Sequence, residues 1–313
     1  MKEKVTYQVE NMKRQTIGVE VEMNRITRRR AAKIAADFFG TGRYGDTAHI
    51  NGYHTWSTYD VQGREWKFSR DVSITASPQK QCELITPILT YNDITTLQEL
   101  LRALRHAGGS STPQDCCGVH VHIGRGDHTP RTIRNLVNLV AAHEDQFIKV
   151  VNVDKERIAR YCKKINPVFL EKLNVKKPDT FEKLADIWYE GNNADFHRNH
   201  HYNRSRYYML NLHALFTKGT IEFRFFQFDN PHDGKQGGIH AGQIKAYIQL
   251  CLALSEFAKE VRYVSPIPQN MKATERYAFQ RLMLRLGFVG DEFSTARSLL
   301  VQNLPGKQIA VSE

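Results

Sequence analysis

Two histidines stand two residues apart in an apolar stretch of the sequence, Cys-Gly-Val-His-Val-His-Ile-Gly, which begins at Cys117. Side chains in a β-strand alternate between its two faces, so His120 and His122 project to one face while their apolar neighbours can pack into a core. Two imidazoles on one face are typical of a ligand site. A hydrogen-bonded pair at a sheet edge is an equally good interpretation of this stretch alone.

The same construction occurs twice more. Glu20 and Glu22 alternate with apolar residues in Ile-Gly-Val-Glu-Val-Glu-Met, and Glu222 and Arg224 do so in Thr-Ile-Glu-Phe-Arg-Phe. A further strand-like stretch, Cys-Glu-Leu-Ile-Thr-Pro, carries the single acid Glu83. Burying such charges is costly unless they face one another or an ion. The repetition therefore predicts a shared polar site, with chance alternation in three edge strands as the alternative.

The polar faces of these stretches combine carboxylates with imidazoles and one arginine. An oxygen-rich set of this kind predicts Mg²⁺ or Mn²⁺ rather than zinc. Magnesium sites commonly share the ion with substrate phosphates, and Arg224 is placed to neutralise charge on a phosphoryl group in transfer. The sequence contains neither a P-loop nor a Gly-x-Gly-x-x-Gly motif. If ATP binds, metals and arginines must hold its phosphates.

The composition is that of a soluble globular protein: 313 residues, 41% hydrophobic and 25% charged. No run of about 18 apolar residues is present, so no membrane span is expected. The basic N-terminus lacks the apolar segment of a signal peptide, and we therefore expect a cytoplasmic protein. The five cysteines are unevenly spaced and do not predict a disulfide framework.

Lysine and arginine total 44 against 33 acidic residues, a net charge of +11. This excess can attract nucleic acid or an anionic substrate, but no nucleic-acid-binding motif accompanies it, so solvated faces are the main expectation. One polar segment, residues 191–206, concentrates His200, His201, Arg204 and Arg206. Contact with an anionic ligand and a mobile solvated loop are equally good interpretations of this segment.

Local patterns predict the main elements. Helices are expected after Thr27, after Asn92, from Thr129-Pro130 and after Gly237-Gly238, and a β-hairpin is expected over 54–59 and 65–68. Residues 40–53 should form a loop, and 207–212 a strand that leads into a turn at 217–219. Two more helices are expected near 272–286 and 291–301.

The ordered motifs resemble those of the amidoligases, within the superfamily of carboxylate-amine ligases that includes glutamine synthetase and γ-glutamylcysteine ligase. They are Gly-Val-Glu-Val-Glu, Cys-Glu-Leu-Ile-Thr-Pro, Gly-Val-His-Val-His-Ile-Gly, Arg-Tyr-Tyr-Met-Leu-Asn-Leu and Thr-Ile-Glu-Phe-Arg. The resemblance covers roughly residues 16–262. Their order and spacing together make the resemblance more specific than any single motif.

The resemblance implies an α+β fold, in which a curved, bowl-like antiparallel β-sheet flanked by helices forms a glutamine synthetase-like catalytic domain. This domain would span residues 1–262, and residues 263–313 would form a C-terminal helical appendage and tail. The implied activity depends on ATP and Mg²⁺ or Mn²⁺. A substrate carboxylate is phosphorylated to an acyl phosphate, and an amine then attacks it to give an amide, ADP and phosphate.

The resemblance also implies roles for individual residues. Glu20, His120 and Glu222 would hold one cation, and Glu22 and Glu83 would hold a second. His122 would lie near the nucleotide, and Arg224 would stabilise the transferring phosphate. Arg206 would bind a substrate carboxylate or phosphate, and Asn211 would orient that site. Asp71 precedes Glu83 in a similar stretch. A further cation contact and a turn cap are equally good interpretations of this aspartate.

Two other function classes remain open at this stage. A metal-dependent hydrolase or nuclease would use the same carboxylates and histidines on a phosphodiester, with water as nucleophile. A basic nucleic-acid-binding module would carry the metal as a structural ion. The paired strands and ordered motifs favour the ligase. Its substrates would be an amino acid or peptide carboxylate and an amine, with an anionic acceptor compatible with the charge, and we expect a monomer or dimer without a membrane partner.

Overall fold

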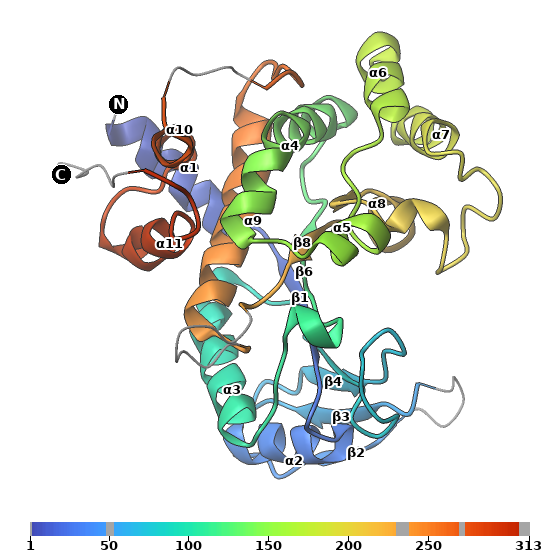
Figure 1. Cartoon of the computed structure of the whole chain (residues 1–313), viewed down its shortest axis with the longest axis vertical. Coiled ribbons are helices and arrows are strands. Elements are labelled where there is room, and N and C mark those ends of the chain that lie inside the picture. The colour runs from blue at the N-terminus through green and yellow to red at the C-terminus, as the bar shows by residue number, and fades with distance from the viewer. Residues whose placement is uncertain (1, 48–52, 230–237, 269–272, 307–313) are drawn as a thin grey trace. The chain divides into compact units, whose positions relative to one another are not determined.

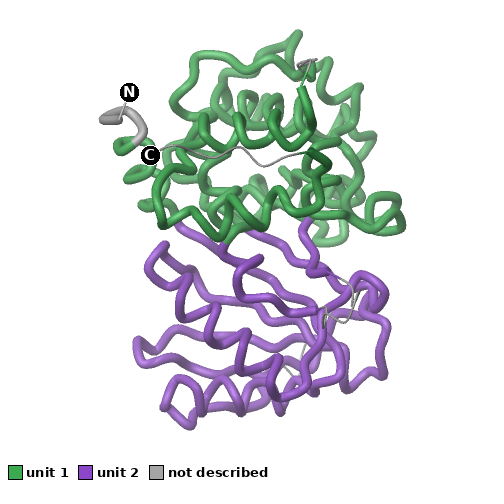
Figure 2. The backbone as a smooth tube through the Cα atoms, turned by 60° about the vertical axis from the view of Figure 1, so that its left-hand side comes forward, with its two compact units in different colours: residues 1–15, 122–225, 246–313 green, residues 16–121, 226–245 purple. Residues whose placement is uncertain are grey.

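The computed structural model describes residues 2–47, 53–229, 238–268 and 273–306. The chain divides into two compact units (Figures 1 and 2). Unit 1 comprises residues 1–15, 122–225 and 246–313, and unit 2 comprises residues 16–121 and 226–245. Strand β6 (Val119–Gly124) and helix α9 (Ala241–Glu260) each begin in unit 2 and end in unit 1.

Unit 2 contains most of the strands. They are β1 (Ile17–Met23), β2 (Tyr44–Asp46), β3 (Trp56–Tyr59), β4 (Glu65–Ser69) and β5 (Cys82–Ile85). They lie in the order β2-β3-β4-β5-β1, followed by β6, and the registered pairs are antiparallel. The predicted hairpin is thus confirmed as β3 and β4.

In unit 2, helix α2 packs beside these strands and helix α3 packs against α2. Helix α2 (Arg28–Phe38) begins as predicted after Thr27, whose hydroxyl accepts a hydrogen bond from the amide of Arg30, and four buried alanines let it pack closely against β3 and α3. Helix α3 (Ile94–His106) follows a 3₁₀ turn over Tyr91–Asp93. Thr90 and Asp93 form the capping box of this 3₁₀ turn, and Asp93 is the N-cap residue of α3, so the prediction of a cap at Asn92 was wrong.

Unit 1 is mainly helical. Its strands lie in the order β6-β8-β7, with β8 over Thr220–Phe226 and β7 over Leu210–Asn211. Its other helices are α1 (Lys2–Lys13), α4 (Pro130–Val151), α5 (Lys155–Arg160), α6 (Pro167–Lys176), α7 (Phe181–Gly191), α8 (His213–Lys218), α10 (Glu275–Arg285) and α11 (Ser294–Leu299). Phe147 of α4 stacks on Phe225 of β8 and meets Phe279 of α10 edge-on, so these elements share one core.

The α+β class with an antiparallel sheet is confirmed, while three further local predictions were wrong. The segment expected as a loop contains β2, and the strand expected over 207–212 is reduced to the two residues of β7. Helix α8 occupies much of the connection that was expected to be a turn. Within the described residues, no helix is both long enough and apolar enough to cross a membrane.

Candidate metal and anion sites

Strand alternation positions the polar side chains as the sequence predicted. In β1 the apolar side chains of Val19, Val21 and Met23 are fully buried, which leaves Glu20 and Glu22 together on the other face. In the antiparallel pair of β1 with β5, Glu22 lies directly opposite Glu83. The amide of Glu22 donates to the carbonyl of Gly118, which sets β6 beside β1.

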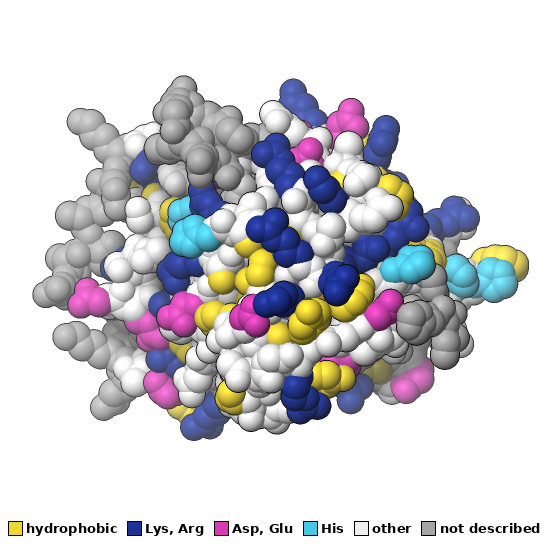
Figure 3. All heavy atoms as spheres, turned by 90° about the horizontal axis from the view of Figure 1, so that it is seen from below, with side chains coloured by type: hydrophobic (Ala, Val, Ile, Leu, Met, Phe, Trp, Pro, Cys, Tyr) yellow, Lys and Arg dark blue, Asp and Glu magenta, His cyan; other side chains and the backbone are white. Residues whose placement is uncertain are grey.

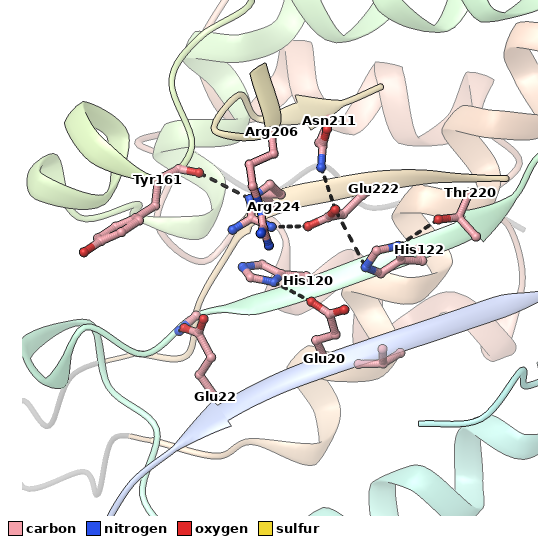
Figure 4. Close-up of polar contacts among 12 residues, drawn as sticks. Glu20, Glu22, His120, His122, Tyr161, Arg206, Asn211, Thr220, Glu222 and Arg224 are labelled. Atoms are coloured by element: carbon pink, nitrogen blue, oxygen red, sulfur yellow. Dashed lines mark hydrogen bonds and ion pairs between the residues drawn. The ribbon is translucent and has the colours of Figure 1, made fainter. Parts of the chain in front are cut away.

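One group of possible metal ligands in unit 2 consists of Glu20, Glu83 and His120. Each residue offers one ligand atom, and these atoms lie within 4.8 Å of one another. The Nδ1 atom of His120 lies 3.0 Å from Oε2 of Glu20 (Figure 4), and the imidazole is 3% exposed. Two carboxylates and a buried imidazole can therefore converge on one cation.

A second group in the same unit consists of Glu22, Asp71 and Glu83, again with ligand atoms within 4.8 Å. Oε2 of Glu22 accepts a hydrogen bond of 2.5 Å from the amide of Gly118, which fixes this carboxylate. Asp71 also accepts a 2.7 Å hydrogen bond from the amide of Ser73. Asp71 is thus both a turn cap and a member of the carboxylate group, the two interpretations that the sequence left open.

The donor set fits a hard divalent cation. The two groups share Glu83 and together contain four carboxylates and one imidazole. Such clustered negative charge in a partly buried place is costly without a cation, and oxygen ligands favour Mg²⁺ or Mn²⁺. Cys82 precedes Glu83 on β5 and is no competing soft ligand, because burial raises the pKa of its thiol to about 12.

Unit 1 contains a buried ion pair on β8. Arg224 donates through Nη1 to Oε1 of Glu222, and the two residues are 4% and 3% exposed. Asn211 lies directly opposite Glu222 in the β7–β8 pair, and its Nδ2 donates to Oε2 of Glu222 over 2.7 Å. Both carboxylate oxygens are thereby held in a fixed orientation (Figure 4).

His122 belongs to the same group. Its Nδ1 lies 3.0 Å from the hydroxyl of Thr220, which fixes the plane of the imidazole. Its Nε2 lies 3.9 Å from Oε2 of Glu222. The ring is buried, so the position of β8 beside β6 determines what it can contact.

Arg224 is supported by residues that the sequence analysis did not single out. Its Nε donates to the carbonyl of Tyr161 over 3.4 Å, and Nη2 of the buried Arg157 donates to the Arg224 carbonyl over 3.3 Å. The ring of Tyr207 lies 5.9 Å from the Arg224 guanidinium and 5.7 Å from that of Arg206. Arg157 and Tyr161 lie in a charged, irregular part of the sequence that carries no motif pointing to them.

The predicted site residues thus fall into two groups. Glu20, Glu22, Glu83 and His120 belong to unit 2, and His122, Arg206, Asn211, Glu222 and Arg224 belong to unit 1. Within unit 2 the possible ligand atoms of each group lie within 4.8 Å of one another, and within unit 1 Asn211 and Arg224 donate hydrogen bonds to Glu222. Their assignment to particular cations, to the nucleotide or to the substrate stays a prediction.

The sequence matches the model of the family described as "Putative amidoligase enzyme" over residues 13–255. The chain therefore belongs to this family, as its motifs predicted, and the family is one of ligase enzymes. No curated protein matches the sequence. Among solved structures, the chain is similar to a bifunctional glutathione synthetase from Pasteurella multocida, with 15% identity and a TM-score of 0.44. The match covers 96% of this chain and 48% of that one, so the chain spans about half the length of that structure.

Proposed function

We propose that the protein is an ATP- and Mg²⁺-dependent carboxylate-amine ligase that acts on an amino acid or peptide through an acyl phosphate. The observation that carries the proposal is the pair of metal-ligand groups in unit 2 that share Glu83. Membership of the amidoligase family supports the same reaction type.

In this proposal Glu20, Glu83 and His120 hold one cation, and Glu22, Asp71 and Glu83 hold a second. When bound, Mg²⁺ or Mn²⁺ neutralises and polarises phosphoryl oxygens, which a reaction between two anions requires. The hydrogen bond from Gly118 to Glu22 and the contact between Glu20 and His120 keep these ligands in place before a cation arrives.

The residues of unit 1 bind and orient the anionic reactants. Arg224 neutralises charge on the transferring phosphoryl group, and Arg206 binds the substrate carboxylate or its phosphate, because a guanidinium offers several donors in one plane. Asn211 positions Glu222, and Glu222 in turn positions Arg224. His122 lies near the bound nucleotide in this proposal.

The proposal includes the finer features that the resemblance implies. These are the bowl-like, glutamine synthetase-like sheet, the catalytic domain over 1–262 with the appendage over 263–313, and a cytoplasmic location. The family match lies inside the proposed catalytic domain. Lys and Arg side chains are spread over the face drawn in Figure 3, with fewer Asp and Glu among them, and the net charge of +11 suits an anionic acceptor.

The test is a screen for ADP release over pairs of acids and amines, with Mg²⁺ or Mn²⁺. We expect release that requires the cation and both substrates, that is lost in Glu83→Gln and that is retained in Glu99→Gln, a matched change of an exposed glutamate on α3. Hydroxylamine in place of the amine should yield a hydroxamate, which reports the acyl phosphate. Metal-dependent cleavage of a phosphodiester without ATP would instead establish the hydrolase alternative.

A further inference from the structure

The segment between α7 and β7 has a hydrogen-bonded core of its own. We call residues 194–206 the His/Arg loop. Nδ2 of Asn203 donates to three carbonyls of this loop, the nearest being that of Ala194 at 3.0 Å, and Asn203 is 5% exposed. The fully buried Ser205 accepts a 3.0 Å hydrogen bond from Nε1 of Trp188. These contacts fix the loop backbone from inside.

The outer side of the His/Arg loop is cationic and aromatic. It presents His197, His200, His201, Arg204, Arg206, Phe196 and Tyr202, with Phe196 80% and Tyr202 51% exposed. Arg198 is paired with the two carboxylates of Asp186 and Asp195, which more than balance its charge within unit 1. In the part of the chain that the structure describes, no carboxylate pairs with Arg204 or Arg206. Within the described residues their two positive charges are thus not neutralised by a carboxylate, and Nη1 of Arg206 donates to the carbonyl of His201 over 3.2 Å.

Stacked cations and rings connect the loop with the buried pair on β8. The Arg206 guanidinium lies 5.5 Å from the ring of Tyr202 and 5.7 Å from that of Tyr207. The Arg224 guanidinium lies 5.9 Å from the same Tyr207 ring, and Arg206 points toward Arg224 (Figure 4). The Tyr207 ring thus lies near both the guanidinium of the loop and that of Arg224.

The Arg206 guanidinium stacked on Tyr202 favours a carboxylate as the ligand. Arg206 and His201 both contact the Tyr202 ring, His201 with a centroid distance of 4.6 Å, and His197 lies 3.9 Å from the Phe196 ring. Base stacking needs open aromatic faces, and the Tyr202 ring already carries the Arg206 guanidinium, whereas the 80% exposed Phe196 ring could still accept a base. A guanidinium stacked on a ring still presents N–H donors at its edge, and these match a planar carboxylate.

We propose that the His/Arg loop binds an acidic peptide segment, in which carboxylates spaced along an extended chain contact Arg204 and Arg206. This assignment of the ligand as a substrate rests on the proposed ligase function. The reacting carboxylate of that peptide would be the one nearest Arg224. The substrate class is therefore a carboxylate-rich peptide rather than a free neutral amino acid.

Binding of a fluorescently labelled hexaglutamate peptide to the full chain, followed by anisotropy at low salt and without ATP, tests the inference. Arg204→Gln and Arg206→Gln should each weaken binding about tenfold, because each removes charge-assisted hydrogen bonds. The matched control is Arg281→Gln on α10, where an exposed arginine also stacks on a tyrosine, Tyr277, at 6.0 Å. This control should bind as the wild type does, and hexaglutamine should not bind.

Unchanged binding in Arg204→Gln would overturn the inference, and because Arg204 is exposed this change leaves the fold intact. Absence of hexaglutamate binding to the wild type would overturn it as well. A labelled RNA hexamer that binds more tightly and displaces the peptide would identify a nucleic-acid surface instead. Hexaglutamate binding without any ADP release in the substrate screen would refute the ligase function while leaving the peptide surface in place. ADP release with neutral acids but not with hexaglutamate would support the ligase function and refute the acidic peptide as its substrate.

Discussion

Glu22 and Glu83 face each other directly across the antiparallel pair of β1 and β5. Like charges at directly opposite positions destabilise a sheet, and Asp71 brings a third carboxylate to the same place. A fold tolerates this arrangement when a cation joins the group. The stability of the protein should therefore depend on divalent cations.

Glu83→Gln tests this dependence. Without metal, the variant should be as stable as the wild type or up to about 1 kcal/mol more stable, because a cross-strand repulsion is removed. Mn²⁺ at a hundred times its dissociation constant should stabilise the wild type by about 2.7 kcal/mol and the variant hardly at all. Thermal unfolding with and without Mn²⁺ measures both effects.

Glu99→Gln, which removes an exposed carboxylate of the same unit, provides the control and should keep the full response to Mn²⁺. Equal stabilisation of wild type and Glu83→Gln by Mn²⁺ would show that these carboxylates do not hold the cation.

The buried pair of Glu222 and Arg224 should be strongly coupled. Arg224→Gln leaves the Glu222 carboxylate without its cation in a buried place, a change that costs about 3–5 kcal/mol. Adding Glu222→Gln should recover part of this loss, with a coupling free energy of about 1–3 kcal/mol. Urea unfolding of the wild type, the two single variants and the double variant gives a double-mutant cycle of unfolding free energies. Strictly additive losses of unfolding free energy would contradict the ion pair.

His128 should make the protein acid-sensitive. Burial lowers the pKa of its imidazole to about 4 from the ordinary 6.5, and the ring contacts the hydroxyls of Thr132 and Ser255. Between pH 6.5 and pH 4 the His128 imidazole thus stays neutral in the folded protein, whereas it binds a proton in the unfolded chain. Stability from this group is fully present above pH 6.5 and is lost as the pH falls toward 4, on the order of 3 kcal/mol.

Free energies of unfolding measured between pH 7 and 4 test this point. His128→Gln should reduce the slope of stability against pH by up to one proton in that window. Parallel curves for wild type and variant would mean that His128 titrates normally in the folded protein.

Arg64 should stabilise unit 2 at neutral pH and lose this effect in acid. It donates to Asp60 within the hairpin and to both oxygens of Asp93 before α3, and the hydrogen bonds that Asp93 accepts from Arg64 lower the pKa of Asp93 to about 2. Arg64→Gln should cost about 2 kcal/mol at pH 7. Because the lowered pKa makes this stability disappear as the pH falls from 3.8 toward 2, denaturant curves of wild type and variant should converge there. A constant difference at every pH would contradict the assignment.

The strands that carry the site were predictable because their polar residues recur every second position among apolar ones. The faces of Glu20, Glu22 and His120 follow from this period alone, and the structure places them as expected. Pairing of β1 with β5 was not predictable, since it depends on long-range contacts that one sequence does not reveal. The sequence left Asp71 open between a cation contact and a turn cap, and only the fold brings it beside Glu22 and Glu83.

Other parts of the chain lacked a decisive local signal. The run Tyr207–Leu212 is apolar and short, and such runs fit a strand or a buried turn equally well, so the brevity of β7 and the start of α8 were missed. Arg157 lies on a short, highly charged helix, where an exposed arginine is the ordinary expectation. Its burial beneath Arg224 is a tertiary contact.

Calorimetry of ATP binding, with and without Mg²⁺, tests the ligase proposal most directly. Wild type should bind ATP only when Mg²⁺ or Mn²⁺ is present, and both Glu83→Gln and Glu222→Gln should abolish this binding, while Glu99→Gln should preserve it. ATP binding that is absent under every metal condition, or that proceeds equally well without metal and in Glu83→Gln, would contradict the ligase account and direct attention to phosphodiester substrates.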